Sequence, residues 1–189
     1  MIEFTQRLVE ITNGLQSLQQ SKIAQKIDAA TDLMLSSIRL NQPILVCGNG
    51  GSSADALHIT GELVGRFLIQ RKALNVICLS ANVAVITAWA NDCEYETIFS
   101  RQVEAHGIAG GVLFCLSTSG NSLNVLRALE TAKRMGLTTI GLTGKGGGAM
   151  TKLCDVLLDV PSNSTPRVQE MHQIIYHFIC ERIEAGIAS

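Results

Sequence analysis

Short apolar runs alternate with helix-like segments along most of this chain. Five runs of strand length follow the first forty residues, and stretches with apolar side chains at helical spacing separate them. Parallel strands need crossover connections, which are usually helices. We therefore expect an α/β fold: one doubly wound, flavodoxin-like domain with a five-stranded parallel sheet flanked by helices. The expected strands are Pro43 to Cys47, Leu74 to Leu79, Gly111 to Leu116, Thr138 to Leu142 and Val156 to Val160.

The first forty residues have a different pattern, with apolar side chains at helical spacing and no strand-like run. One stripe begins at Phe4 and ends at Leu15, and a second set runs from Ile27 to Ile38. A chain of 189 residues suits one domain. We therefore expect a single domain over residues 1–189, made of a helical segment (1–40) and an α/β core (41–189).

Composition and charge exclude several classes of protein. Hydrophobic residues make up 47% of the chain and charged residues 16%, which argues against disorder. A formal net charge of −1 argues against a nucleic-acid surface built on bulk positive charge and leaves only a local basic patch open. No apolar stretch is long enough for a membrane span, and the first seven residues do not resemble a signal peptide. The six cysteines form no C-x-x-C pair, so we expect buried free thiols and a cytoplasmic protein.

A hydroxyl-rich turn follows the third expected strand. The residues from Ser117 to Ser122 read Ser-Thr-Ser-Gly-Asn-Ser, and the following segment places Leu123, Leu126, Leu129 and Met135 at near-helical spacing. A helix N-terminus offers unpaired amides and a partial positive charge, and hydroxyl groups can add hydrogen bonds to an anion. Capping of the helix would explain one hydroxyl. Four within six residues favour an anion site, and these are Ser117, Thr118, Ser119 and Ser122.

A glycine-rich turn follows the first expected strand in the same way. It reads Cys47-Gly-Asn-Gly-Gly-Ser-Ser53, and its glycines allow the backbone to approach a ligand closely. Its glycine spacing does not fit a dinucleotide fingerprint, and no Gly-Lys-Ser/Thr follows as in a Walker loop. Two phosphate-binding turns without either signature indicate a phosphorylated small molecule such as a sugar. The candidate contacts in this turn are Asn49, Gly50, Gly51 and Ser52.

Two helical segments carry side chains that could do chemistry. His58 and Glu62 are four residues apart and so share a helix face, although a solvated pair would have the same spacing. Gln169 and His177 lie on the terminal segment, about 12 Å apart along a helix. His177 could equally be a packed core histidine, and we interpret His172 and His106 as surface or interhelix residues. Together His58, Glu62, Gln169 and His177 would form a set suited to a divalent metal such as zinc.

Glu62 and His177 could also exchange protons with a substrate, because burial and neighbouring groups can tune both side chains toward neutral pH. Asp92, in the sequence Ala90-Asn91-Asp92, is a further polar candidate for recognising hydroxyl groups. An ordinary Asn-Asp turn is the alternative interpretation.

These motifs together resemble the sugar isomerase (SIS) domain family, and within it the bacterial phosphoheptose isomerases. The resemblance spans nearly the whole chain and depends on both turns, on His58 with Glu62, on Ala90-Asn91-Asp92, on Leu142 to Lys145, and on Arg167 to His172 followed by His177. It implies a homotetramer with sites built between subunits and with the N-terminal helices in oligomerisation.

The resemblance also implies roles for individual residues. The substrate would be a seven-carbon sugar phosphate, sedoheptulose 7-phosphate, converted to D-glycero-D-manno-heptose 7-phosphate for lipopolysaccharide or related glycoconjugates. One zinc ion per subunit would be held by His58, Glu62, Gln169 and His177. Ser52, Ser117, Ser119 and Ser122 would hold the phosphate, and Asn49, Asp92 and Thr118 would lie near the sugar hydroxyls. Aldose–ketose isomerisation needs a base and an acid, for which we expect Glu62 and His177.

One departure and one alternative accompany this resemblance. Some relatives carry an acidic residue where this chain has Pro166, so any sugar contact made there is absent or replaced. The alternative function is a non-catalytic tetrameric protein of the same fold that binds the replication initiator. In that branch other residues replace the acid/base positions, so the presence of Glu62 and His177 favours the enzyme.

Overall fold

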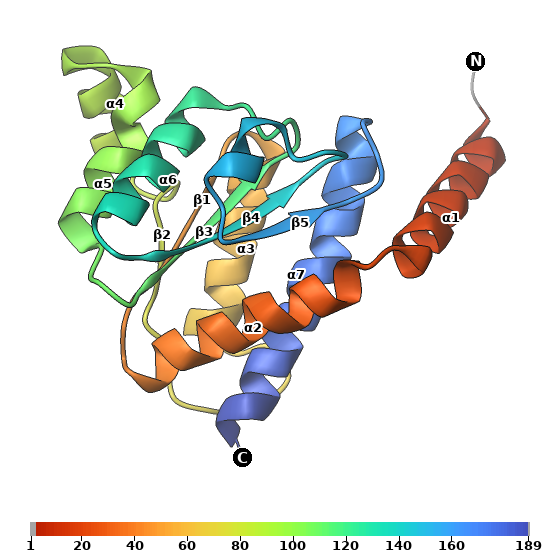
Figure 1. The fold of residues 1–189 in the computed structure, drawn as a ribbon, viewed down its shortest axis with the longest axis horizontal. Helices are drawn as coiled ribbons and strands as arrows, with labels where there is room; N and C mark the ends of the chain where they lie inside the picture. The colour runs from red at the N-terminus through yellow and green to blue at the C-terminus, as the bar shows by residue number, and fades with distance from the viewer. Residues whose placement is uncertain (1–2, 189) are drawn as a thin grey trace.

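The five expected strands form one parallel sheet (Figure 1) in the computed structural model, which describes residues 3–188. The strand order is β2-β1-β3-β4-β5, which is the flavodoxin-like order. The expected doubly wound α/β fold is therefore confirmed, and the strand ends differ from the expected ones by at most two residues. The strands are β1 (Ile44–Gly48), β2 (Val76–Cys78), β3 (Val112–Ser117), β4 (Thr138–Thr143) and β5 (Val156–Asp159).

Helices cover both faces of the sheet, as its apolar strands require. Successive side chains of β3 pack on opposite faces: Phe114 lies in the core under α2, α3 and α7, and Leu113 in the core under α5 and α6. The helices of the first face are α2 (Ile23–Arg39), α3 (Gly51–Val64) and α7 (Thr165–Ala188). Those on the other side are α4 (Val83–Asp92), α5 (Ile98–His106) and α6 (Leu123–Arg134), with the short 3-10 helices η1 (Tyr95–Thr97) and η2 (Gly148–Lys152).

Helix α6 follows the expected apolar spacing with one exception. Leu129 is fully buried, and Leu126 and Met135 pack against the same core. Leu123 is 58% exposed because it begins the helix at the rim of the sheet, so its expected place in the apolar stripe is wrong.

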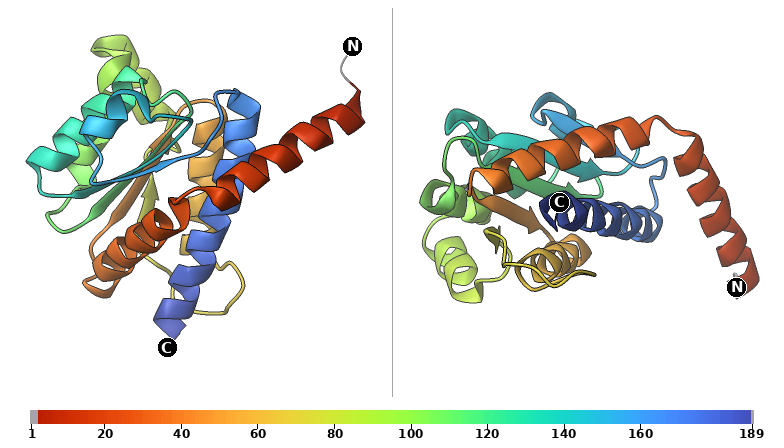
Figure 2. Two further views of the ribbon diagram at one scale, coloured as in Figure 1. Left: turned by 45° about the vertical axis from the view of Figure 1, so that its right-hand side comes forward. Right: turned by 90° about the horizontal axis from the view of Figure 1, so that it is seen from below.

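The N-terminal helical segment consists of two helices that meet near Ser21. Helix α1 (Phe4–Gln20) extends away from the body of the domain (Figure 2), whereas α2 packs on the sheet. No described residue of α1 is buried, and Phe4 is 76% exposed. Among residues 3–188, no helix combines the length and apolar character needed to cross a membrane.

The six cysteines are free thiols, as expected. Four of them are buried: Cys47, Cys78, Cys115 and Cys180. Cys93 is exposed, so the expected burial does not hold for every thiol.

Candidate functional site

The loops after β1 and β3 meet at the carboxyl edge of the sheet. These strands are neighbours, yet the chain leaves them toward opposite faces: β1 leads into α3 and β3 into α6. In open α/β sheets, ligands bind at such a switch point. Each loop opens into a helix N-terminus, where unpaired amides favour an anion.

A pocket of about 270 Å³ lies between these two loops. We call it the hydroxyl pocket, because serine and threonine side chains supply much of its polar lining. It brings together most of the residues that the sequence assigns to substrate binding, and Thr165 at the start of α7 is an addition that the sequence analysis missed. The lining residues are Asn49, Gly50, Gly51, Ser52, Leu116, Ser117, Thr118, Ser122, Thr165 and Gln169.

The serine hydroxyls of this pocket are not used to cap α6. Ser122 occupies the N-cap position, but its side chain makes no capping hydrogen bond. Its Oγ instead lies 3.1 Å from Oγ of Ser117. Both hydroxyls therefore face the pocket with hydrogen-bonding capacity left for a ligand, which favours the anion interpretation over simple capping.

Two glycines shape the first loop. Gly50 has a φ of +55°, a conformation that glycine adopts without strain. At Gly51, an added Cβ would lie 2.2 Å from Nε2 of Gln169, so glycine leaves room for the Gln169 amide in this position and a larger residue would displace it. The contact places the Gln169 amide at the hydroxyl pocket.

Asn49 is held by two side chains that the sequence analysis did not identify. Its amide exchanges hydrogen bonds with Asn124, whose Oδ1 accepts at 2.8 Å and whose Nδ2 donates at 2.9 Å. The Tyr95 hydroxyl donates a further bond to Asn49 Oδ1 at 3.0 Å. Asn124 could have been noticed as a polar residue on the inward face of an amphipathic helix, whereas nothing in the sequence distinguishes Tyr95.

Four of the expected substrate contacts, Glu62, Asn91, Asp92 and Ser119, lie outside the hydroxyl pocket of the single chain. Ser119 is exposed beside it. Asn91 and Asp92 form the last turn of α4 rather than a separate turn, and Asn91 Nδ2 donates to Asp92 Oδ1 at 2.8 Å. Asp92 lines a larger, mostly apolar cavity of about 690 Å³ between α4 and α5.

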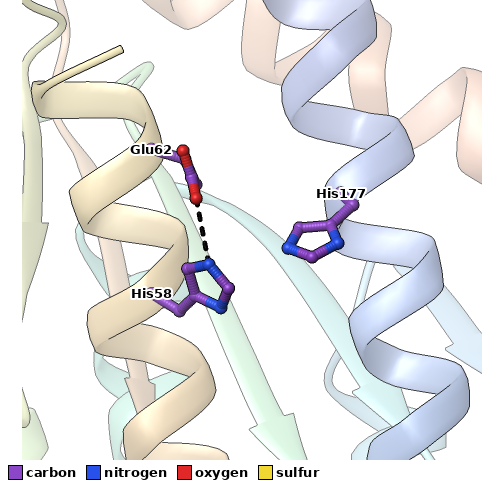
Figure 3. A group of neighbouring side chains, drawn as sticks. All are labelled: His58, Glu62 and His177. Atoms are coloured by element: carbon purple, nitrogen blue, oxygen red, sulfur yellow. Dashed lines mark hydrogen bonds and ion pairs between the residues drawn. The ribbon is translucent and has the colours of Figure 1, made fainter. Parts of the chain in front are cut away.

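His58, Glu62 and His177 converge between α3 and α7 (Figure 3), and we call them the His-Glu-His group. One potential ligand atom from each lies within 4.8 Å of the other two. His58 Nε2 is 2.9 Å from Glu62 Oε1, and the rings of His58 and His177 meet edge to face at 5.0 Å. His177 therefore faces two functional side chains and is not simply a core residue.

The chemistry of the His-Glu-His group fits a divalent metal. Two imidazoles and one carboxylate form a donor set that zinc accepts. His177 Nε2 is buried and has no hydrogen-bond partner among residues 3–188, so its capacity to bind is unused. Burial, with the positive potential of His58, lowers the pKa of His177, and Glu62 opposes this only partly. A lower pKa keeps the imidazole neutral, the form that binds metals.

Gln169 does not join the His-Glu-His group within one chain. Gln169 and His177 both lie on α7, and eight residues of helix separate them by about 12 Å along the axis. Gln169 contacts Gly51, near the start of α3, whereas His177 contacts His58, about two turns further along that helix. The structure thus divides the four expected ligands between two places.

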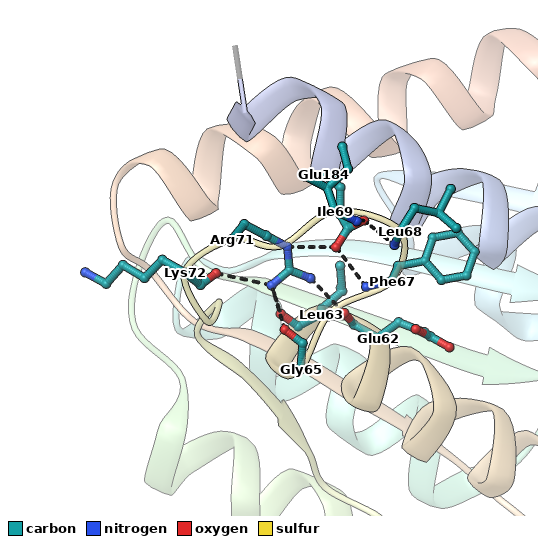
Figure 4. Close-up of polar contacts among 9 residues, drawn as sticks. All are labelled: Glu62, Leu63, Gly65, Phe67, Leu68, Ile69, Arg71, Lys72 and Glu184. Atoms are coloured by element: carbon teal, nitrogen blue, oxygen red, sulfur yellow. Dashed lines mark hydrogen bonds and ion pairs between the residues drawn. The ribbon is translucent and has the colours of Figure 1, made fainter.

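A buried ion pair holds the loop that follows α3 (Figure 4). Glu184 accepts hydrogen bonds from the backbone amides of Phe67, Leu68 and Ile69 at 2.6–2.9 Å, and its Oε1 lies 3.0 Å from Arg71 Nε. Burial opposes ionisation of Glu184, but the three amides and Arg71 together outweigh it and hold its pKa below the usual value. We call Arg71 and Glu184 the loop clamp.

The loop clamp supports the His-Glu-His group from behind. Arg71 Nη2 donates to the Glu62 carbonyl at 2.7 Å, and the Phe67 ring stacks on the His177 ring at 5.4 Å. Both ends of the group are thus tied to one buried ion pair. This ion pair was not predicted from the sequence, although a glutamate at the inward position one turn after Cys180 was a signal.

His172 is fully buried, so of its two expected places, on the surface or between helices, the surface is excluded. It lies on the inward face of α7 together with Val168 and Ile175, where desolvation lowers its pKa to about 4. His106, by contrast, is exposed at the end of α5, as expected.

Residues 8–144 match the SIS domain family. A phosphoheptose isomerase from Crocosphaera subtropica is 46% identical over 93% of this chain and 89% of its own length. Among solved structures, phosphoheptose isomerases from Neisseria gonorrhoeae and Francisella tularensis superpose with TM-scores of 0.89 and 0.83, each at 36% identity. The superposition on the Neisseria gonorrhoeae protein covers 95% of this chain and 95% of that protein. The superposition on the Francisella tularensis protein covers 94% of this chain and 97% of that protein.

These similarities cover the α3 helix, the glycine-rich and hydroxyl-rich loops and, in the longer alignments, nearly the whole of the chain. They extend over elements that build both the hydroxyl pocket and the His-Glu-His group. The chain belongs to the SIS domain family and, within it, to the phosphoheptose isomerases.

Proposed function

We propose that this chain is an aldose–ketose isomerase that converts sedoheptulose 7-phosphate to D-glycero-D-manno-heptose 7-phosphate. The product would enter the synthesis of heptose for lipopolysaccharide or related glycoconjugates. The observation that carries this proposal is the position of the hydroxyl pocket and the His-Glu-His group along the same two helices, α3 and α7. One region can bind a phosphate and the other can move a proton.

The spacing of the two regions suits an open-chain sugar phosphate. Ser52 and His58 are six residues apart on α3, or about 9 Å along its axis. Eight extended bonds from the first carbon to the phosphorus span roughly 10 Å, at about 1.2 Å per bond. A phosphate in the hydroxyl pocket would therefore allow the far end of the sugar to reach the His-Glu-His group.

We assign the phosphate to Ser52, Ser117 and Ser122 within the pocket, to Ser119 beside it, and to the helix N-termini. Asn49 and Thr118 then contact the sugar chain, with the backbone of Gly50 and Gly51 close by. Asn91 and Asp92 line a different cavity in the single chain. Their proposed contacts with the sugar hydroxyls therefore require a site assembled between subunits.

The isomerisation moves a proton between the first and second carbons through an enediol. We assign Glu62 as the base that removes this proton and His177 as its acid/base partner. The lowered pKa of His177 favours the neutral imidazole, which can accept one proton and return it. Glu62 is 2.9 Å from His58 through one oxygen, which leaves the other oxygen to face the substrate.

We propose zinc as the metal, one ion per subunit, held by His58, Glu62 and His177. When bound, zinc supplies an electrophile that stabilises the negative charge developing on the sugar oxygen. Because Gln169 lies about 12 Å away along α7, we propose that it completes a site shared with a neighbouring subunit.

We further propose that the chain forms a homotetramer in the cytoplasm. Large apolar side chains are exposed on α3 and α7, the helices that carry the His-Glu-His group, and on α1, which extends away from the domain. Assembly would cover these side chains. Light scattering coupled to size exclusion would test this, because a monomeric mass would contradict it. The exposed residues are Phe4, Leu8 and Val9 on α1, Leu57 and Val64 on α3, and Ile174 and Phe178 on α7.

The experiment that tests the function is incubation of the zinc-loaded protein with sedoheptulose 7-phosphate. We expect an aldose phosphate to form, detected by the loss of the ketose carbonyl signal in ¹³C spectra of labelled substrate. Solvent deuterium should appear at the second carbon if the enediol exchanges its proton. Absence of aldose from a folded, metal-loaded protein would overturn the proposal.

A further inference from the structure

Two side chains behind His58 connect it to the interior of the domain. The Nδ1 atom of His58 lies 2.9 Å from the Tyr176 hydroxyl, on the side of the ring away from Glu62. The same hydroxyl donates to Asp55 Oδ1 at 3.5 Å. Asp55 precedes His58 by about one turn of α3, and Tyr176 precedes His177 on α7. Neither residue takes part in the proposed proton transfer.

The hydrogens of this chain of contacts can be assigned. A phenol has one hydrogen to donate, and an ionised carboxylate only accepts. Without a metal, His58 Nε2 donates to Glu62 Oε1, because the carboxylate can only accept. With Nε2 bound to a metal instead, the hydrogen of the neutral ring lies on Nδ1, where it can be donated to the Tyr176 hydroxyl, which in turn donates to Asp55.

Packing makes this arrangement specific. Tyr176 is 1% exposed, and its ring meets those of His58 and His177 edge to face at 5.5 Å and 4.9 Å. Tyr176 also belongs to the hydrophobic core under α3 and α7, so packing sets the position of its ring, and the hydroxyl is an additional group directed at His58. Asp55 is half-buried, so its carboxylate lies close to the protein interior rather than in bulk water.

We propose that Tyr176 and Asp55 are positioning residues that fix His58 as the Nδ1–H tautomer, so that Nε2 is presented to the metal. This inference rests on the proposed metal role and extends it to two residues outside the donor set. Histidines that bind metals commonly donate their other N–H to a protein acceptor, and loss of such an acceptor weakens metal binding by about 10- to 100-fold. A tyrosine relayed to a carboxylate is the acceptor in this chain.

The test is the zinc affinity of Tyr176→Phe, measured by competition with a chromophoric chelator after metal removal. We expect binding to be about 10- to 100-fold weaker than in the unaltered protein. The chain has one other tyrosine, and Tyr95→Phe removes a hydroxyl that contacts Asn49 and not His58, so its zinc affinity should be unchanged. Equal affinities for Tyr176→Phe and the unaltered protein would overturn the inference.

A second measurement on the metal-free protein separates this inference from the metal proposal. In ¹⁵N-histidine spectra, at a pH where the ring is neutral, the Nδ1–H form of His58 should be populated beside the Nε2–H form that donates to Glu62. Tyr176→Phe and Asp55→Ala should shift the population toward Nε2–H while thermal unfolding of the metal-free protein shows that the fold is kept. An unchanged tautomer in both variants would overturn the inference, even if zinc binds. If zinc does not bind at all but the tautomer shifts, the metal role fails and the positioning role stands.

Discussion

The hydroxyl pocket and the His-Glu-His group are built in different ways. The pocket lies in the turns directly after β1 and β3, and the parallel register of these strands brings the turns together. The group lies in the middle of α3 and α7, which meet only because both helices pack on one face of the sheet. The pocket offers neutral donors to an anion, whereas the group offers titratable side chains. Changes in the pocket should therefore affect substrate affinity, and changes in the group should affect turnover.

The largest effect should follow from Glu62→Gln, which keeps the shape of the side chain but removes the proposed base. We expect kcat to fall about 1,000-fold with little change in KM, since general bases contribute about 10²- to 10⁴-fold. Glu181→Gln, at an exposed position of α7, is the matched control. Near-normal turnover by a folded Glu62→Gln protein would contradict the assignment of turnover to the His-Glu-His group and of substrate affinity to the hydroxyl pocket.

Removal of the metal should have the next largest effect. We expect a chelator to lower kcat by about 100-fold or more, because a bound metal contributes several kcal/mol to the stabilisation of developing charge. Addition of zinc should restore the activity. Phosphate affinity of the hydroxyl pocket, measured with inorganic phosphate, should not change on chelation, and a parallel loss would show that the two regions are one unit.

Lowering the pH should lower the free energy of unfolding, because His172 is buried on α7, the helix that joins the two regions. The pKa of His172 is about 4 in the folded chain and about 6.5 in the unfolded chain, so the unfolded chain binds the proton first as the pH falls. Stability is thus lost toward acid, by about 2 kcal/mol between pH 6.5 and 5 at 1.36 kcal/mol per unit. Denaturant unfolding of His172→Gln should lack this loss, and His106→Gln, at an exposed site, should keep it. Equal pH dependence in all three proteins would contradict the burial argument.

The smallest effect should come from single hydroxyls of the pocket. Ser122→Ala should raise KM roughly tenfold, as expected for one hydrogen bond to a charged group, and leave kcat within about threefold. Its unfolding free energy should not change, because the Ser122 side chain does not cap α6. Ser36→Ala on the surface of α2 provides the control. A fall in kcat with KM unchanged would place this serine with the chemistry instead.

The contrast between the two regions also explains what the sequence could predict. The hydroxyl pocket was predictable because each loop follows a recognisable strand, and the fold rule brings the carboxyl ends of such strands to one edge. His58 and Glu62 were recognisable by their spacing along one helix. The placement of Gln169 opposite Gly51 was not, because it depends on how α3 and α7 approach each other.

Contacts between distant segments were harder still. Tyr95 reaches Asn49 and Glu184 reaches Arg71 through the packing of the whole domain. The inward position of Glu184 signals a buried carboxylate, but local spacing does not identify the partner of either residue. The burial of His172 was missed because a single histidine on a mixed helix does not reveal which face is inward.

The loop clamp has a consequence for how far the chain can be shortened. All residues assigned to catalysis lie at or before His177, so the last turns of α7 look dispensable by sequence. Glu184 nevertheless supplies the acceptor for three consecutive amides in the segment behind the His-Glu-His group. A protein cut after Cys180 would keep every proposed ligand and both loops, yet it would leave those amides and Arg71 without their partner. The C-terminal limit of the catalytic unit is therefore set by Glu184, a residue that never touches the sugar.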